Sequence, residues 1–464
     1  MSTELIISVS GLRGIVGDNL TEQVAIEYGC AFGTFLKARK TDTKTKMSIC
    51  IGRDSRTSGE QLTSAVSRGL CSVGIDVIDL GLVPTPTVGI MLRELGCDGG
   101  VVITASHNPA PYNGIKLLLD NGIAPTPGAA GDIKKRFLDK DFNAVDSADQ
   151  GKITANARSN VTHISRIMPI IDKQVIRSKS YKVALDSVNG AGGPITKEML
   201  AELNCEVVAI NDEPTGRFAH TPEPTVDNVT ELCKVVKKQG AAVGFAQDPD
   251  ADRLAIVDEN GTYIGEEYTL ALAAKYIFSK QTGPAATNLS TSRMIDDIAE
   301  AAAGHVIRTA VGEANVAAAM IAHDCVIGGE GNGGVIDLRV GPIRDSLVAI
   351  ALILQLMTET GKTISQLVGQ INRYYMCKEK CGADKTQAKQ VLASAKKVFV
   401  DARLDTTDGC RFDFDDGWLH LRTSNTEPVM RVIVEAKDRR TAETYIDAVS
   451  NIRNKILGPT DEQS

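Results

Sequence analysis

Three aspartates at alternate positions, Asp248, Asp250 and Asp252, follow the apolar run 243–246 in the segment Asp-Pro-Asp-Ala-Asp-Arg. Two carboxylates 4 Å apart repel each other by about 4 kcal/mol at an effective dielectric constant near 20, so a bound cation would stabilise this arrangement. Oxygen-only ligands favour a hard ion such as magnesium or calcium. The segment predicts a magnesium site with Arg253 beside it, and the alternative is a solvated acidic surface loop.

An EF-hand calcium loop begins with the same alternation of aspartates. In that motif the sixth position is a glycine, which makes the sharp turn, and a helix follows. Here the sixth position is Arg253, and the next residues have the pattern of a strand. These two differences exclude an EF-hand.

A serine, Ser106, follows the predicted strand 101–103 in the segment Thr-Ala-Ser-His-Asn-Pro. The carboxyl end of a parallel strand is the edge at which α/β proteins bind ligands. The Ser106 hydroxyl is therefore a candidate nucleophile if a base or a metal lies nearby, and otherwise an ordinary turn residue.

Two more loops have the composition of binding sites. The glycine-rich segment 328–334 contains Glu330 and Asn332, whose side chains can hydrogen-bond to neighbouring hydroxyls of a sugar. The segment 422–428 and a nearby arginine offer cationic, hydroxyl and amide groups to a phosphate, namely Arg422, Ser424, Asn425, Thr426 and Arg431. A merely flexible loop and a polar hairpin turn are the respective alternatives. Together the four loops describe a cleft for a phosphorylated sugar.

Alternating helix and strand patterns must position these loops. The first units are a helical pattern at 21–36, a buried strand at 48–51, a helix whose start is marked by Ser58 and Gln61, and strands at 75–80 and 100–104. Strands separated by helices predict a mostly parallel sheet. A polar stretch at 139–157 has the composition of a linker or surface loop.

A weak internal repeat runs along the chain. The order strand, aspartate, small-residue loop and helix appears at 49–62, recurs at 181–203 and is fainter at 285–298. Three related α/β units in tandem are the hypothesis, although many α/β proteins repeat this order without internal homology. The last hundred residues read instead as a hairpin, a further strand and a closing helix, a small α+β domain.

Composition excludes several functional classes. The 464 residues contain 51 Lys and Arg and 58 Asp and Glu, a net charge of -7, which disfavours nucleic-acid binding by bulk charge. The longest apolar run, Leu347 to Leu354, is shorter than the roughly 18 residues of a membrane span and predicts a buried helix. The first residues lack the pattern of an export signal. Ten scattered cysteines are expected to be reduced thiols in a cytoplasmic protein.

The four loops, in this order, resemble the signature segments of the α-D-phosphohexomutase superfamily, which includes phosphoglucomutase, phosphomannomutase and phosphoglucosamine mutase. The resemblance implies a heart-shaped enzyme of three related α/β domains with mixed sheets and a smaller C-terminal α+β domain around a central cleft. We expect domain I at residues 1–155, domain II at 156–257, domain III at 258–370 and domain IV at 371–464. A monomer or a homodimer is expected.

The resemblance also implies roles for individual residues. Ser106 matches the phosphorylated serine, and the three aspartates match the Mg²⁺ ligands, with a phosphoserine oxygen completing the set. Arg13, in Ser-Gly-Leu-Arg-Gly-Ile, resembles an active-site arginine, and Lys116, in Asn-Gly-Ile-Lys, resembles the general base. His107 would assist Arg13, and the cations near Lys116 are expected to lower its pKa.

The implied reaction interconverts hexose 1-phosphate and hexose 6-phosphate through a hexose 1,6-bisphosphate. The Glu-Gly-Asn-Gly-Gly form of the sugar segment is similar to archaeal-type phosphoglucosamine mutases, so glucosamine phosphate is the expected substrate, with mannose or glucose phosphate as alternatives. A metal-dependent sugar phosphatase would use the first two loops without a distant phosphate site. A non-catalytic calcium-binding protein would use the aspartates alone.

Overall fold

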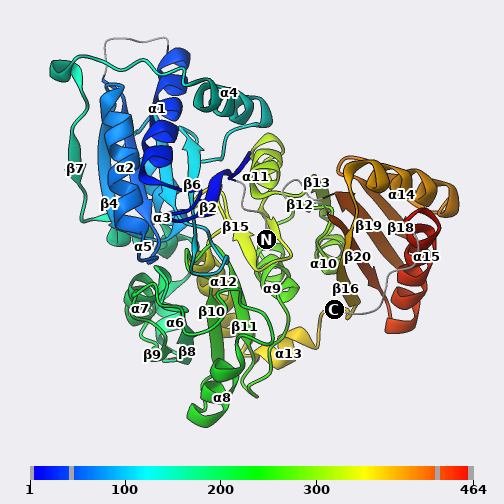
Figure 1. Ribbon diagram of the computed structural model, residues 1–464. Helices are drawn as coiled ribbons and strands as arrows, with labels where there is room; N and C mark the ends of the chain where they lie inside the picture. The colour runs from blue at the N-terminus through cyan, green and yellow to red at the C-terminus, as the bar shows by residue number, and fades with distance from the viewer. Residues whose placement is uncertain (1–4, 41–45, 424–428, 458–464) are drawn as a thin grey trace.

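The computed structural model describes residues 5–40, 46–423 and 429–457, and within them the alternating patterns of the sequence form four separate sheets (Figure 1). The first sheet is mixed and has the strand order β1-β2-β6-β5-β3-β4-β7. The elements of domain I are β1 (Ile6–Ser8), β2 (Gly11–Ile15), α1 (Glu22–Arg39), β3 (Ser48–Arg53), α2 (Gly59–Ser72), β4 (Asp76–Leu82), α3 (Thr85–Glu94), β5 (Gly99–Ile103), β6 (Tyr112–Leu119), α4 (Pro127–Asp139) and β7 (Ile153–Ala155).

Two local predictions in domain I need correction. The helix predicted after Ser58 is α2, but the Ser58 hydroxyl does not cap it, because Ser58 has a helical backbone conformation and its Oγ accepts a hydrogen bond from Asn113 Nδ2 at 2.9 Å. The polar stretch 139–157 is not only a loop. It contains the short exposed strand β7, which pairs in parallel with β4 and extends the sheet.

Domains II and III repeat one pattern. Domain II consists of α5 (Ser159–Ile167), α6 (Lys173–Arg177), β8 (Lys182–Asp186), α7 (Gly192–Glu202), β9 (Glu206–Ile210), α8 (Thr230–Gln239), β10 (Val243–Gln247) and β11 (Leu254–Val257). Domain III consists of α9 (Glu267–Phe278), β12 (Pro284–Asn288), α10 (Met294–Ala301), β13 (His305–Thr309), α11 (Glu313–Ala322), β14 (Ile327–Glu330), β15 (Gly334–Ile336), α12 (Ser346–Thr360) and α13 (Ile364–Val368). Their strand orders are β11-β10-β8-β9 and β13-β12-β14-β15.

The internal repeat predicted from the sequence is confirmed by these strand orders. In each of the first three domains three parallel strands are followed by an antiparallel one, in the orders β4-β3-β5-β6, β9-β8-β10-β11 and β13-β12-β14-β15. The Ser106 loop joins β5 to β6, the aspartate loop joins β10 to β11, and the glycine-rich loop joins β14 to β15. Three different binding loops therefore occupy the same topological position in three related sheets.

One apolar core joins domains II and III. It includes side chains from β8, β10 and α9 and nearly all of α12, whose residues 346–358 are all buried. The apolar run Leu347 to Leu354 is thus a buried helix, as predicted. Domain I has its own core under α1 and α4. None of the described helices combines the length and the apolar character that crossing a membrane requires.

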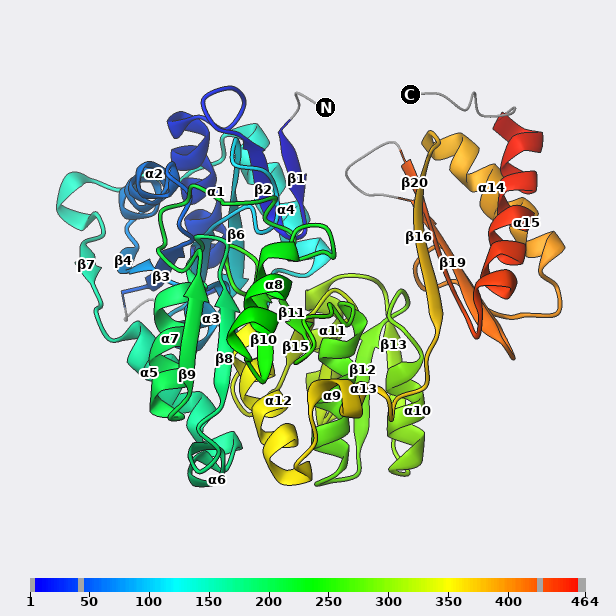
Figure 2. The same ribbon diagram turned by 90° about the horizontal axis from the view of Figure 1, so that it is seen from below.

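Domain IV is an antiparallel sheet with two helices against one face (Figure 2). The strand order is β16-β20-β19-β18-β17. The elements are β16 (Tyr375–Gly382), α14 (Lys385–Val398), β17 (Arg403–Asp405), β18 (Cys410–Phe414), β19 (Gly417–Thr423), β20 (Val429–Ala436) and α15 (Arg439–Leu457). Its apolar core is separate from those of the other domains, and its other face carries polar residues toward domain III. The exact domain boundaries stay a prediction.

Candidate active site

Ser106 lies at the carboxyl end of β5 in a strained turn. Its φ of +48° belongs to the left-handed region, which is costly for a residue with a Cβ and is kept only where the surroundings fix it. The Ser106 backbone N–H donates to Thr104 Oγ1 at 2.8 Å, and the residue is 3% exposed. The turn directs the Ser106 hydroxyl toward domain II, where it donates to Asp248 Oδ2 at 2.8 Å.

Arg56 supports the backbone of this turn. This residue was not predicted from the sequence. The buried guanidinium donates through Nη2 to the carbonyl oxygens of Ser106 and Asn108, both at 2.6 Å, while Nε contacts Asp54 Oδ2 at 3.1 Å. Asp54 also accepts from Thr104 Oγ1 at 2.6 Å. A signal was present in the sequence, because the segment Asp-Ser-Arg that contains Arg56 directly follows β3. Arg56 therefore fixes the backbone on which Ser106 depends.

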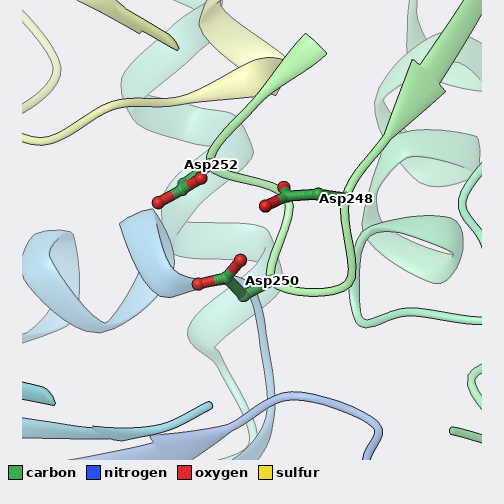
Figure 3. A group of neighbouring side chains, drawn as sticks. All are labelled: Asp248, Asp250 and Asp252. Atoms are coloured by element: carbon green, nitrogen blue, oxygen red, sulfur yellow. The ribbon is translucent and has the colours of Figure 1, made fainter. Parts of the chain in front are cut away.

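The three aspartates lie in the turn between β10 and β11, and their carboxylates face one another (Figure 3). All three are fully buried, and one oxygen of each lies within 4.8 Å of the others. The turn closes with Ala251 at a φ of +53°, the second strained residue of the site. The structure thus brings together the predicted metal ligands and Ser106, which come from two different domains.

The aspartate cluster fits a divalent cation. Asp250 Oδ1 and Asp252 Oδ1 are buried and have no hydrogen-bond partner within the described parts of the chain. Leaving a buried charged acceptor unsatisfied costs several kcal/mol, about 1–3 kcal/mol even for a neutral group, and a hard cation would satisfy both oxygens. Burial and then the neighbouring carboxylates of Asp252 and Asp250 raise the pKa of Asp248 well above its usual range.

Lys116, on β6, contacts the same cluster. Its Nζ lies 2.7 Å from Asp250 Oδ2 and 3.6 Å from Asp252 Oδ2. Burial opposes its charge, but the two carboxylates outweigh burial and raise the pKa of the ammonium. The prediction that nearby cations lower this pKa is therefore wrong for the protein without a metal ion, because the sequence did not reveal which charges surround Lys116. A cation on the aspartates would offset their field.

His107 contacts the Ser106 hydroxyl, and Arg13 and Arg253 lie near His107. Arg13 Nη1 donates to Asn108 Oδ1 at 2.7 Å, and His107 Nδ1 lies 3.3 Å from Ser106 Oγ. Burial, then the charges of Arg253 and Arg13, lower the pKa of His107 to about 2, so its imidazole is neutral. The backbone N–H of Arg253 donates to Asp248 Oδ1 at 3.1 Å. The predicted residues Arg13, His107 and Arg253 therefore lie close together beside the Ser106 loop.

A second arginine that the sequence reasoning missed, Arg344, lies between the aspartate loop and the glycine-rich loop. Its Nη2 donates to Asp252 Oδ2 at 2.6 Å, and its Nη1 donates to Glu330 Oε2 at 2.7 Å. Glu313 Oε1 accepts from the Arg344 backbone N–H at 2.6 Å. No sequence motif marked this residue, since it lies in a short connection before α12.

The glycine-rich loop lines a cleft of about 210 Å³ between domains III and IV. Glu330 and Asn332, both predicted, are on its wall, and Asn288 Nδ2 donates to Glu330 Oε1 at 2.8 Å. A further carboxylate on the wall, Glu267, was not predicted. The pKa of Glu267 is raised to about 7 by burial, even though Lys378 Nζ lies 3.1 Å from its Oε1.

Domain IV contributes cations to the opposite wall of the cleft. Arg422 and Arg431 are paired directly across β19 and β20, and Lys380 of β16 is paired with Arg431 on its other side. Like charges that face each other across strands are destabilising, so this row favours an anion. Arg422 Nε contacts Asp408 Oδ2 at 3.2 Å. The predicted binding residues Ser424, Asn425 and Thr426 lie outside the described residues.

Comparison with protein families gives four matches that follow the chain in order. The models are those of phosphoglucomutase/phosphomannomutase alpha/beta/alpha domain I at residues 5–144, domain II at 161–261 and domain III at 266–374, and of the C-terminal domain at 377–452. The chain belongs to the phosphoglucomutase/phosphomannomutase family. It is therefore a phosphohexomutase by family, an isomerase that transfers a phosphate within its substrate.

Relatives in this family cover nearly the whole chain. A phosphoglucomutase/phosphomannomutase of Thermococcus kodakarensis is 38% identical over 444 residues, 94% of this chain and 96% of that protein. A probable phosphoglucosamine mutase of Pyrococcus abyssi is 36% identical over 449 residues, 96% of each chain. Among solved structures, a phosphoglucomutase/phosphomannomutase family protein of Burkholderia thailandensis has a TM-score of 0.86 at 27% identity and covers 98% of this chain and 99% of its own. The resemblance and the four-domain fold predicted from the sequence are both confirmed.

Proposed function

We propose that this phosphohexomutase interconverts hexose 1-phosphate and hexose 6-phosphate through a phosphate carried by Ser106 and a hexose 1,6-bisphosphate intermediate. The observation that carries the proposal is the contact between Ser106 Oγ and Asp248 Oδ2 at 2.8 Å. It places the hydroxyl of a serine in a strained turn against a buried cluster of three carboxylates. A nucleophilic serine needs an activating group of this kind.

Asp248, Asp250 and Asp252 would hold a magnesium ion together with an oxygen of phosphorylated Ser106. Their donor set is purely oxygen, as this ion prefers, and two of the buried oxygens have no hydrogen-bond partner among the described residues. When bound, magnesium neutralises charge on the phosphoryl group that is transferred. The chain's own contribution is to keep the carboxylates buried and aligned before the substrate arrives.

In the transfer step the bond between Ser106 Oγ and phosphorus breaks as a sugar hydroxyl oxygen bonds to phosphorus. The neutral His107, which contacts Ser106 Oγ, and Arg13, which contacts Asn108 of the same loop, would donate hydrogen bonds to phosphoryl oxygens. The hydroxyl proton goes to Lys116 Nζ, which must first be neutral. The reverse step, after the bisphosphate has turned over in the cleft, returns the other phosphate to Ser106.

The phosphate that is not transferred would bind at the cationic wall of domain IV. Arg422 and Arg431 are described there, and Ser424, Asn425 and Thr426 are proposed to complete the site. Arg253 would contact the substrate next to the aspartate loop. Because the sugar binds in two orientations, Glu330 and Asn332 must accept either face of it.

We propose glucosamine phosphate as the preferred substrate. Glu330 and Glu267 lie on one wall of the cleft with Asn332, and carboxylates favour the ammonium group that distinguishes this sugar from glucose and mannose. Several relatives carry the name probable phosphoglucosamine mutase. The T. kodakarensis relative carries the name phosphoglucomutase/phosphomannomutase, which keeps glucose and mannose phosphates as the alternative.

The experiment is a comparison of kcat/KM for the 1-phosphates of glucosamine, glucose and mannose, with magnesium and a trace of bisphosphate. We expect isomerisation to the 6-phosphates, with glucosamine the best substrate. A glucosamine value no higher than the others would overturn the substrate proposal alone. Release of inorganic phosphate without any 6-phosphate would overturn the mutase proposal in favour of a phosphatase.

The compartment is proposed from thiol chemistry. All ten cysteines lie within the described residues and are free thiols, as a reducing compartment would maintain them. We therefore propose that the enzyme works in the cytoplasm, and export of an oxidised form would contradict this.

A further inference from the structure

Arg344 connects two loops that serve different purposes. Its guanidinium contacts Asp252 of the aspartate loop at 2.6 Å and Glu330 of the glycine-rich loop, hereafter the sugar loop, at 2.7 Å. Arg344 is only 7% exposed. A guanidinium is planar and rigid, so its two terminal nitrogens cannot move independently. A displacement of the Glu330 carboxylate therefore acts on the Asp252 carboxylate through one group.

The contact with Arg344 also decides which oxygen of Asp252 remains available. Oδ2 accepts from Arg344, whereas Oδ1 has no hydrogen-bond partner among the described residues. Asp250 is arranged in the same way, with Oδ2 held by Thr85 Oγ1 at 2.6 Å and by Lys116 at 2.7 Å, and Oδ1 left over. Groups that orient metal ligands in this way strongly affect metal affinity.

The segment that carries Arg344 is itself firmly held. Asp345 caps α12 by accepting from the Leu347 N–H at 2.9 Å, and its other oxygen lies 2.7 Å from Nε2 of the fully buried His163. Ser346 Oγ donates to the carbonyl oxygen of Ala251, in the aspartate loop, at 2.7 Å. The backbone around Arg344 is thus held in place, and its guanidinium is the side-chain group that contacts both loops.

The backbones of the two loops also meet. The Leu254 N–H, at the end of the aspartate loop, donates to the Gly333 carbonyl oxygen at 3.0 Å. Gly333 has a φ of +85°, and a Cβ there would lie 2.3 Å from the Leu254 oxygen, so only glycine permits this approach. The two loops are therefore one connected unit with Arg344 as its side-chain bridge.

We propose that Arg344 is a positioning residue that couples divalent-cation binding at the aspartates to sugar-phosphate binding at the sugar loop. The proposal rests on the function proposed above for these two loops. Binding of a sugar phosphate at Glu330 fixes the guanidinium, which then holds Asp252 Oδ1 toward the cation. By linkage, the cation increases sugar-phosphate affinity by the same factor.

The test measures Mn²⁺ binding to the full-length protein by electron paramagnetic resonance, with and without saturating glucosamine 6-phosphate. The ratio of the two dissociation constants is the coupling factor, which we expect to be about 5-fold or more in the wild-type protein. In Arg344→Gln we expect the Mn²⁺ dissociation constant to rise about 10–100-fold and the coupling factor to fall at least threefold. The matched control is Arg339→Gln, because Arg339 is an exposed arginine paired with Asp337 in the same connection.

Arg344→Lys keeps the charge but cannot reach both carboxylates, so it should also lose the coupling, and it serves if the glutamine variant does not fold. A coupling factor that falls less than threefold in the folded variant, or that equals one in the wild-type protein, overturns the proposal even if Mn²⁺ binds more weakly. A fall of threefold or more that Arg339→Gln does not reproduce supports it. Isomerisation by the wild-type protein is measured in parallel, since its absence would count against the proposed function and not against Arg344.

Discussion

The aspartate loop and domain IV are held in opposite ways. The aspartate loop of domain II is contacted by both other α/β domains, through Thr85 and Lys116 of domain I and Arg344 of domain III, and its carboxylates are fully buried. Domain IV keeps a separate core and meets domain III through polar contacts such as that between Ser290 Oγ and His420 Nδ1. The proposed chemistry therefore lies in a region held by neighbouring domains, and the proposed site for the distant phosphate lies on a domain with a core of its own.

Removing the Ser106 hydroxyl should have the largest effect. Because it is the proposed phosphate carrier, Ser106→Ala should lower kcat/KM on the order of a thousandfold or more, without loss of the fold. Steady-state isomerase kinetics and the melting temperature measure this. The control is Ser165→Ala, which removes an exposed hydroxyl on α5 that donates only to a local carbonyl. Retained activity in Ser106→Ala would show that Ser106 is not the phosphate carrier and that the reaction takes place elsewhere.

Neutralising one aspartate should weaken metal binding more than replacing a residue that only orients the aspartates. Asp250→Asn and Asp252→Asn each remove the negative charge of a proposed metal ligand, so Mn²⁺ affinity should fall by more than the roughly 10–100-fold that outer-shell changes cost. Calorimetry or paramagnetic resonance measures the dissociation constant directly. Asp227→Asn, at an exposed position of domain II, should leave it unchanged. Equal affinity in all three variants would show that the cluster does not bind the metal.

Weakening the contacts between domain IV and domain III should change substrate binding only. Arg293, at the start of α10, donates to the carbonyl oxygens of Phe414 and Gly417 at 3.2 and 3.0 Å. At about 1 kcal/mol for each hydrogen bond, Arg293→Ala should raise KM by about 5- to 30-fold and leave Mn²⁺ affinity within twofold of wild type. Arg403→Ala, on the exposed edge strand β17, is the control. A matching loss of metal affinity would mean that the two regions are not independent.

Glu267 should give the smallest effect, a pH dependence of stability. Burial raises its pKa to about 7, above the value in the unfolded chain, so the folded protein holds the proton more tightly. Stability from this group is complete at pH below about 4.5 and is lost as pH rises through 7, by about 1.4 kcal/mol for each unit of pKa difference. Glu267→Gln should flatten the melting temperature between pH 5 and 8.

The control for this measurement is Glu300→Gln, on an exposed position of α10. It should leave the slope of melting temperature against pH unchanged. A slope in Glu267→Gln identical to that of the wild-type protein would show that Glu267 titrates as an ordinary surface carboxylate.

Much of the fold followed from periodicity and small-residue loops. The strand, aspartate and small-residue loop at β3 and β8, with a fainter form at β12 where Asn288 ends the strand, gave the hypothesis of three related domains. The alternating aspartates predicted the metal cluster. Ser58 and Gln61 predicted a side-chain cap at the start of α2. Ser58 does not provide this cap, because its backbone is helical and its Oγ accepts a hydrogen bond from Asn113 on β6. The rise in the Lys116 pKa could not be foreseen because it depends on Asp250, 134 residues away. Arg344 escaped notice for the same reason, since its partner Asp252 is 92 residues away.

The most direct test of the account is to ask whether Ser106 carries phosphate during turnover. Intact-mass spectrometry and phosphorus NMR of the protein mixed with a hexose 1,6-bisphosphate should show one added phosphoryl group, located at Ser106 by peptide analysis and removed by excess hexose monophosphate. Phosphate that never appears on Ser106, while isomerisation proceeds at its normal rate, would contradict the account.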